Sequence, residues 1–107
     1  MARKRRHALV YARAVVAHMR MIDAKHHALT REAIEQQLTF GPDIETRNRK
    51  PLRQPAAFAA EWEIRFGPDN RFRVLYDIDR DDRAVRILAI GRKEGNRLLI
   101  GREEVEL

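Results

Sequence analysis

The sequence predicts one α+β domain in which two N-terminal helices pack on a small antiparallel β-sheet. The chain between residues 12 and 39 has apolar residues at helical spacing. Residues 62–93 instead alternate in steps of two and are divided by tight turns, which is typical of antiparallel strands with one covered face. A chain of 107 residues has room for one core, so residues 1–107 are expected to form a single domain.

Two short helices are expected before the sheet. The first begins near residue 12, and its expected buried stripe is Ala12, Val15, Val16, Met19 and Ile22. A break at residues 24–27 leads to a second helix over residues 28–39, whose expected buried residues are Ala33, Ile34 and Leu38. Gly41 and Pro42 end this helix. The short turn between the helices indicates an antiparallel helical hairpin, and residues 7–11 are compatible with a short first strand.

Three strands are expected in residues 62–90, with turns at residues 67–70 and 79–83. The face expected to be covered carries Trp62, Ile64, Phe66, Phe72, Val74, Tyr76 and Ile78. The opposite face carries Glu63, Arg65, Arg71, Arg73, Leu75 and Asp77, and we expect it to be open. The third strand is apolar on both faces, as a central strand is, and residues 98–100 could add a short last strand.

The composition narrows the classes of function. The net charge is +6, and the positive excess lies in residues 1–55, chiefly at residues 3–6 and 47–53. Such clusters suit phosphate backbones and acidic proteins equally well, or form a solvated surface that aids solubility. The absence of cysteine excludes disulfides and thiolate zinc sites. No segment is long enough to span a membrane, so we expect a cytoplasmic protein without a membrane partner.

Most familiar catalytic and metal motifs are missing. His18, His26 and His27 have no cysteine or carboxylate beside them at ligand-like spacing, so no metal site is expected. The sequence also lacks a P-loop and a serine nucleophile elbow. We therefore expect no metal and no cofactor.

Cations on or beside the strands are the remaining candidates for chemistry. A sheet face lined with cations could bind RNA and stabilise a pentacovalent phosphate. The candidate cations are Arg65, Arg73, Arg92 and Lys93 on or at the ends of the strands, and Arg47, Arg49, Lys50 and Arg53 in the preceding loop. Arginine holds phosphate through its planar fork and stays charged. Cleavage of RNA by its own 2′-hydroxyl needs no metal, only positioning, cations, a base and an acid. From the residues alone, surface ion pairs with Glu61, Glu63, Asp77 and Asp79 are an equally good interpretation.

The order of these elements resembles toxins of the RelE/ParE superfamily from bacterial toxin–antitoxin modules. The matching segments are AIEQQL (33–38), ETRNRKPLR (45–53), WEIRF (62–66), FRVLYDI (72–78) and VRILAIGRK (85–93). The resemblance implies the α+β fold described above and a cognate antitoxin that wraps an extended segment around the toxin. RelE-type members cut mRNA in the ribosomal A site, which implies catalytic roles for Arg65, Arg73, Arg92 and Lys93.

Two positions differ from the RelE-type nuclease pattern. Glu63 stands where those nucleases tend to have a basic residue, and Leu99 lies near the place of a tyrosine. ParE-like members of the superfamily lack the nuclease set and poison DNA gyrase. The predicted function is a ribosome-dependent mRNA endoribonuclease with ribosome and mRNA as partners. The alternatives are a gyrase-binding toxin without catalysis and a basic RNA-binding domain without toxicity.

Overall fold

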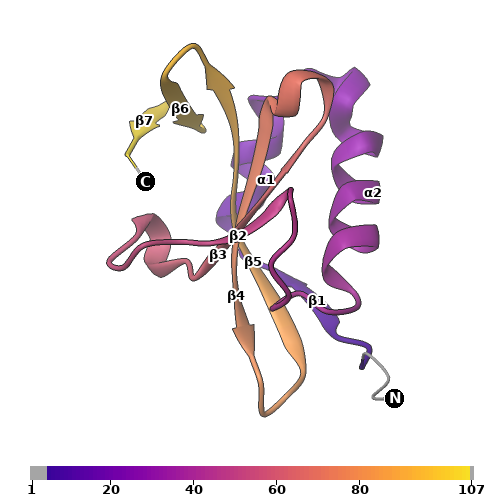
Figure 1. The fold of residues 1–107 in the computed structure, drawn as a ribbon. Helices are drawn as coiled ribbons and strands as arrows, with labels where there is room; N and C mark the ends of the chain where they lie inside the picture. The colour runs from indigo at the N-terminus through magenta and orange to yellow at the C-terminus, as the bar shows by residue number, and fades with distance from the viewer. Residues whose placement is uncertain (1–4, 107) are drawn as a thin grey trace.

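The computed structural model describes residues 5–106 and has its helices on one side of a curved sheet (Figure 1). The α-helices are α1 (Ala14–Arg20) and α2 (His27–Leu38), and short 3-10 helices cover Ala24–His26, Ala57–Ala59 and Pro68–Asn70. The strands are β1 (Ala8–Tyr11), β2 (Arg49–Pro51), β3 (Trp62–Phe66), β4 (Phe72–Asp79), β5 (Ala84–Glu94), β6 (Arg97–Ile100) and β7 (Glu103–Val105). The α+β class, two α-helices before the main strands and the three central strands are confirmed.

The sheet is larger than predicted, and the helices are not the first elements of the fold. Within residues 5–106 it has seven strands, ordered β2-β3-β4-β5-β6-β7, with β1 paired to β5. The β1–β5 pairing is parallel, whereas the pairs along the main path are antiparallel. Strands β2 and β7 have only three residues each, which is too short for a period-two pattern to be recognised.

The main core lies between the helices and the sheet. Ile34, Leu38, Ile64, Val74 and Tyr76 are almost completely buried in it. The expected stripe on α1 was wrong at one position, because Val16 is 58% exposed. The residues that α1 and the turn after it bury are Val15, His18 and Ile22, at the i, i+3, i+7 spacing of one helical face. Val16 lies about 100° around the helix from Val15 and points away from the sheet.

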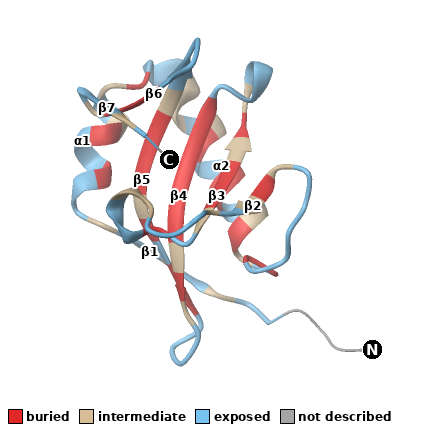
Figure 2. Cartoon of the chain, turned by 60° about the vertical axis from the view of Figure 1, so that its left-hand side comes forward, coloured by how far each residue is buried: buried red, intermediate tan, exposed pale blue. Residues whose placement is uncertain are grey.

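The second face of the sheet is partly covered, which corrects the prediction of an open arginine-bearing face. A smaller cluster of Ala60, Leu75, Ala89, Leu98 and Ile100 packs there, with Leu52, Leu88 and Val105 at its edge. A β-bulge lets Leu75 pair with Ala89 and Tyr76 with Ile87. The bulge places one extra residue in β5, which bends the sheet. The β6–β7 hairpin folds back over the bent face. Strands β4 and β5 are accordingly buried along most of their length (Figure 2).

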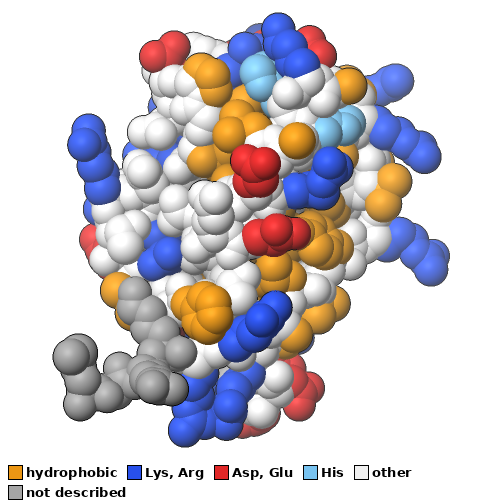
Figure 3. Space-filling view, turned by 90° about the vertical axis from the view of Figure 1, so that its right-hand side faces the viewer, with side chains coloured by type: hydrophobic (Ala, Val, Ile, Leu, Met, Phe, Trp, Pro, Cys, Tyr) orange, Lys and Arg blue, Asp and Glu red, His pale blue; other side chains and the backbone are white. Residues whose placement is uncertain are grey.

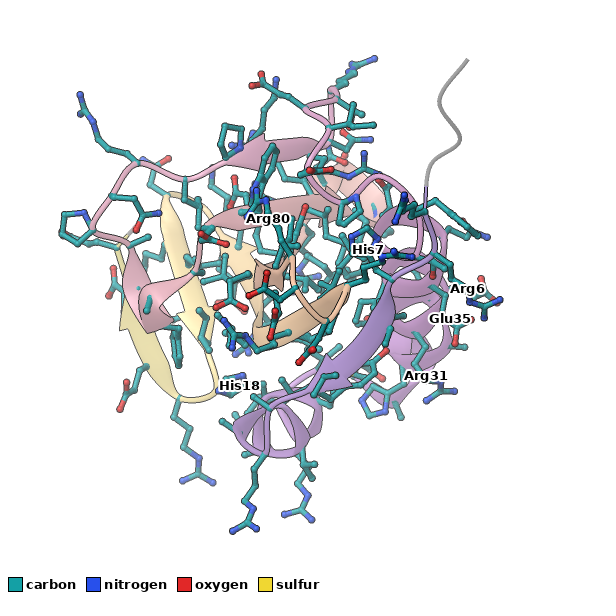
Figure 4. All side chains as sticks on the ribbon, turned by 90° about the horizontal axis from the view of Figure 1, so that it is seen from below. Arg6, His7, His18, Arg31, Glu35 and Arg80 are labelled. Carbon is teal, nitrogen blue, oxygen red and sulfur yellow. The ribbon has the colours of Figure 1, made fainter. Side chains whose placement is uncertain are left out.

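His18 links α1 to the sheet through a buried ring (Figure 4). Its Nδ1 accepts a hydrogen bond from the backbone N–H of Ile90 at 3.2 Å, which only a ring unprotonated at Nδ1 can do. The ring of Phe58 packs edge-on against it at a centroid distance of 5.7 Å. Burial lowers the pKa of His18 below its ordinary value.

We expect this histidine to make the folded state sensitive to mild acid. In the unfolded chain His18 takes up a proton near pH ~6.5, whereas the folded state resists protonation to lower pH. The stabilisation is fully present above that value and is lost as the pH falls toward the folded pKa. Urea unfolding between pH 5 and pH 8 should therefore show a smaller loss of unfolding free energy for His18→Gln, whose amide oxygen can still accept from Ile90. His7→Gln is the control, and identical pH dependence in wild type and His18→Gln would contradict the expectation.

Candidate functional site

A polar cavity of about 440 Å³ lies on the sheet face opposite the helices. Its lining residues come from β3, β4, β5, the following turn and the β6–β7 hairpin, and they are Glu63, Arg65, Arg73, Lys93, Asn96, Leu98, Glu104, Val105 and Glu106. Cations from three neighbouring strands therefore converge on one hollow. The cavity is bounded on its far side by the C-terminal segment, which Figure 2 shows in front of the sheet.

The pairing register of β3 and β4 brings three charged residues together at the buried part of the cavity. Arg65 on β3 pairs directly with Arg73 on β4, and Glu63 lies two residues along β3 on the same face. Glu63 and Arg73 are both buried, whereas the Arg65 side chain is 43% exposed. Two arginines directly opposite each other repel, and the carboxylate of Glu63 compensates this repulsion.

The contacts of Glu63 leave one of its oxygens free. Its Oε1 accepts a hydrogen bond from Arg65 Nε at 2.9 Å. Its Oε2 is 4.0 Å from Arg73 Nε and is buried without a hydrogen-bond partner in the described residues. A buried carboxylate oxygen without a donor is costly and is therefore rare outside functional sites.

Arg73 is held rigidly at the base of the cavity. Its Nη1 donates to the backbone carbonyls of Asn70 and Phe72. Burial lowers the pKa of the Arg73 guanidinium, and the Glu63 carboxylate opposes that shift while Arg65 adds to it. Arginine remains charged in proteins, so Arg73 presents a positive group whose Nε faces Glu63 Oε2 at 4.0 Å and whose Nε and Nη2 make no hydrogen bond within the described residues.

Arg92 does not join the other three predicted catalytic residues. It follows Gly91 and precedes Lys93 on β5, so it points to the opposite face of the sheet. Its Nη1 donates to the carbonyl of Met21 at the end of α1 at 3.2 Å, and its Nε donates to Glu94 at 3.1 Å. Strand parity alone would have separated Arg92 from Lys93.

None of the four predicted RNA-binding loop residues lines the cavity. Arg49 is 7% exposed and donates to the backbone carbonyls of Gln37 at 2.6 Å and Ile44 at 2.9 Å. It thereby caps the C-terminal end of α2 and fixes the loop that follows. Lys50 forms an exposed ion pair with Glu45 at 3.3 Å. Arg47 and Arg53 are exposed on the surface.

Three polar residues of the cavity were missed at the sequence level: Asn96, Glu104 and Glu106. Strand β7 brings two of them back over the sheet by pairing Val105 with Leu98 and Glu104 with Leu99. This hairpin turns at Gly101, whose φ of +61° suits glycine. The acidic end was visible in the sequence, but a three-residue strand gives no signal of where that end returns.

The ion-pair interpretation of the arginines is realised only in part. Arg65 pairs with Glu63, and Arg86 forms a two-pronged pair with Asp77 at 2.6 and 2.8 Å. Lys93 has no ion pair in the described residues. The basic set of the cavity is therefore only partly neutralised by ion pairs within the sheet.

A second hollow, an apolar groove of about 550 Å³, lies between α1, α2 and the end of β1. Val15, Met19, Ile34 and Ile90 contribute to its apolar lining. Arg31 and Glu35, one turn apart on α2, stand on its rim (Figure 4). On this side of the molecule hydrophobic side chains reach the surface between charged ones (Figure 3). Tyr11 and Val16 are 45% and 58% exposed.

Neither a metal cluster nor a membrane-spanning helix is found in the described part of the chain. Residues 5–106 contain no group of three or more His, Asp or Glu side chains arranged to hold a metal ion. No helix among them is long and apolar enough to cross a bilayer.

Comparisons with known proteins identify the fold. No family model matches the chain, and no curated protein sequence matches it. Among solved structures, a chain of the toxin–antitoxin complex RelBE2 from Mycobacterium tuberculosis is similar, with a TM-score of 0.68 and 22% sequence identity. The match covers 86% of this chain and 98% of that chain. The protein therefore shares its fold with that chain of the RelBE2 complex.

The buried position of Arg49 generates a prediction about stability. Arg49→Met should keep the aliphatic packing but leave the carbonyls of Gln37 and Ile44 without their donor, at a cost of about 3 kcal/mol in unfolding free energy. Lys50→Met removes an exposed pair and should cost less than about 1 kcal/mol. Urea unfolding measures both, and equal stability of the two variants would show that Arg49 is not structural.

Proposed function

We propose that this chain is the toxin of a toxin–antitoxin pair and that it cleaves mRNA held in the cavity at Arg65, Arg73 and Lys93. The observation that carries the proposal is that these three cations line one cavity together with Glu63, whose Oε2 lies 4.0 Å from Arg73 Nε and has no hydrogen-bond partner in the described residues. The fold shared with a chain of the RelBE2 toxin–antitoxin complex supports the toxin assignment. Ribosome-bound mRNA is the proposed substrate, which places the activity in the cytoplasm.

The three cations suit a phosphodiester in different ways. Arg73 is fixed by two backbone carbonyls, so its remaining N–H groups are oriented before a ligand arrives. Arg65 is half-exposed, and Lys93 stands at the end of the same face. A pre-organised guanidinium stabilises the negative charge that develops on the phosphoryl oxygens in the transition state. It does so without having to move during the reaction.

Glu63 supplies the base that RNA cleavage requires. The 2′-oxygen of the substrate attacks phosphorus, and its proton passes to the Glu63 carboxylate, whose buried Oε2 becomes accessible when RNA binds. The bond from phosphorus to the 5′-oxygen breaks, and the leaving oxygen takes a proton from the ammonium group of Lys93. The products are a 2′,3′-cyclic phosphate and a 5′-hydroxyl. Arg65 holds the other carboxylate oxygen in place at 2.9 Å.

Glu63→Gln tests this role with little change of shape. We expect cleavage of mRNA at ribosomes to fall at least about a hundredfold, because an amide cannot accept the 2′-proton. Binding of an uncleavable 2′-deoxy analogue should be retained, since the cations remain. Glu45→Gln, which removes an exposed carboxylate outside the cavity, is the control. Measurements are mapped mRNA 5′ ends after induction and, in parallel, plasmid supercoiling. Intact mRNA together with altered supercoiling would overturn the nuclease proposal.

The proposed antitoxin partner occupies the apolar groove between α1 and α2. Exposed apolar side chains there would be buried by a partner. The chain carries a net charge of +6, so an acidic partner is electrostatically complementary. Val16 lines the groove and is exposed, which makes it a position where a charge disturbs docking more than folding.

Val16→Asp should weaken binding of the proposed antitoxin. A charge buried in an apolar interface without a partner costs several kcal/mol, so we expect at least about a hundredfold loss in affinity. Ile44→Asp is the matched control, because Ile44 is 43% exposed and does not line the groove. Co-purification and titration calorimetry measure the effect. If both variants retained the antitoxin equally, the antitoxin would bind outside the apolar groove.

A further inference from the structure

The cavity that holds the three cations is electrically balanced by carboxylates. Its lining contains Arg65, Arg73 and Lys93, but also Glu63, Glu104 and Glu106, so the formal charges of the lining sum to zero. Glu63 is already paired with Arg65 at 2.9 Å. The two remaining carboxylates come from the C-terminal segment and share the hollow with Arg73 and Lys93. A phosphodiester that enters this hollow therefore lies near carboxylates as well as cations.

The segment that carries these two carboxylates makes few contacts with the rest of the sheet. Strand β7 has three residues and pairs only with β6, through three residue pairs. Glu103 and Glu104 are exposed, and Val105 is only half-buried at the edge of the smaller cluster. The ion pair of Glu104 with Arg97 at 3.3 Å joins two exposed side chains, and such pairs contribute little. Figure 1 shows β7 as an outer strand next to β6 at the edge of the sheet.

We propose that β7 and its carboxylates are a built-in competitor of RNA for the cavity. Glu104 and Glu106 occupy the mouth in the resting protein, and the substrate phosphate binds as this segment swings away. Opening a short edge strand costs little compared with global unfolding. The inference rests on the proposed function, because it concerns access of RNA to the cavity at Arg73. It assigns the acidic end of the chain a regulatory role in place of a catalytic one.

Glu104→Gln/Glu106→Gln tests the competition while preserving side-chain shape. The probe is a fluorescein-labelled single-stranded RNA with 2′-deoxy substitutions, so that binding is measured by anisotropy without cleavage. We expect the double variant to bind about tenfold more tightly than wild type, because two like charges near the phosphate are removed. Adding Arg73→Lys to the double variant should cancel most of this gain, because Lys offers no planar fork to phosphate.

A matched variant controls for the change in net charge. Glu32→Gln/Asp81→Asn removes two exposed carboxylates outside the cavity, so it changes the net charge equally. It should tighten binding by less than about threefold at physiological salt, where distant surface charges are screened. Circular dichroism and urea unfolding confirm that each variant is folded. Glu106→Gln alone, which leaves the Arg97–Glu104 pair intact, should give part of the gain.

The outcomes separate this inference from the proposed function. Equal tightening by the double variant and the matched control would overturn the competition, because only net charge would matter. Unchanged or weaker binding by the double variant, with wild type binding RNA, would also overturn it and leave RNA binding itself intact. Absence of RNA binding by wild type and double variant alike would overturn the competition, and it would overturn the proposed function as well only if mRNA at ribosomes also stayed uncut after induction.

Discussion

The long antiparallel pairing of β4 with β5 is the interaction on which the rest of this structure depends. Residues 72–79 of β4 face residues 84–92 of β5, and nearly all of β4 is buried. One side of this pair supports the helices through Val74, Tyr76 and Ile87. The other side carries Leu75 and Ala89, over which the β6–β7 hairpin folds. Because both faces are covered, alternate residues of these two strands pack in different apolar environments. The bulge at Leu75 and Tyr76 shifts the pairing register between the two strands.

Much of the fold could be predicted because it is written in local periodicity. The helix spacing of Ile34 and Leu38, and the alternation of Ile64 and Phe66, each depend on residues close together in the chain. The pairing of β1 with β5 joins segments more than seventy residues apart, and no local pattern encodes it. Val16 shows the same limit on a smaller scale, since a seven-residue helix fits more than one apolar stripe.

The sequence predicted which types of residue form the candidate site, but it predicted less well which individual residues line it. Arg65, Arg73 and Lys93 share a face because strand parity places them there, and the same rule excludes Arg92. Arg49 was beyond such reasoning. Its role depends on where the carbonyls of Gln37 and Ile44 lie in space, and an arginine in a basic loop is ordinarily exposed. Likewise, only the three-dimensional path of β7 brings Glu104 to the cavity.

The basic residues that give the chain its net positive charge are not the residues that line the polar cavity. The positive excess comes from residues 1–55, and among those that the structure describes, residues 5–55, none lines the polar cavity. The cavity lining has no net formal charge in the resting arrangement. Exposed cations such as Arg47 and Arg53 contribute a field that reaches a polyanion from about a Debye length, ~8 Å at physiological salt. The charge that the cavity presents at Arg73 instead depends on which carboxylates lie beside it. A basic overall charge therefore favours the approach of a polyanion, and the local balance among Glu63, Glu104 and Arg73 sets the charge that a ligand meets in the cavity.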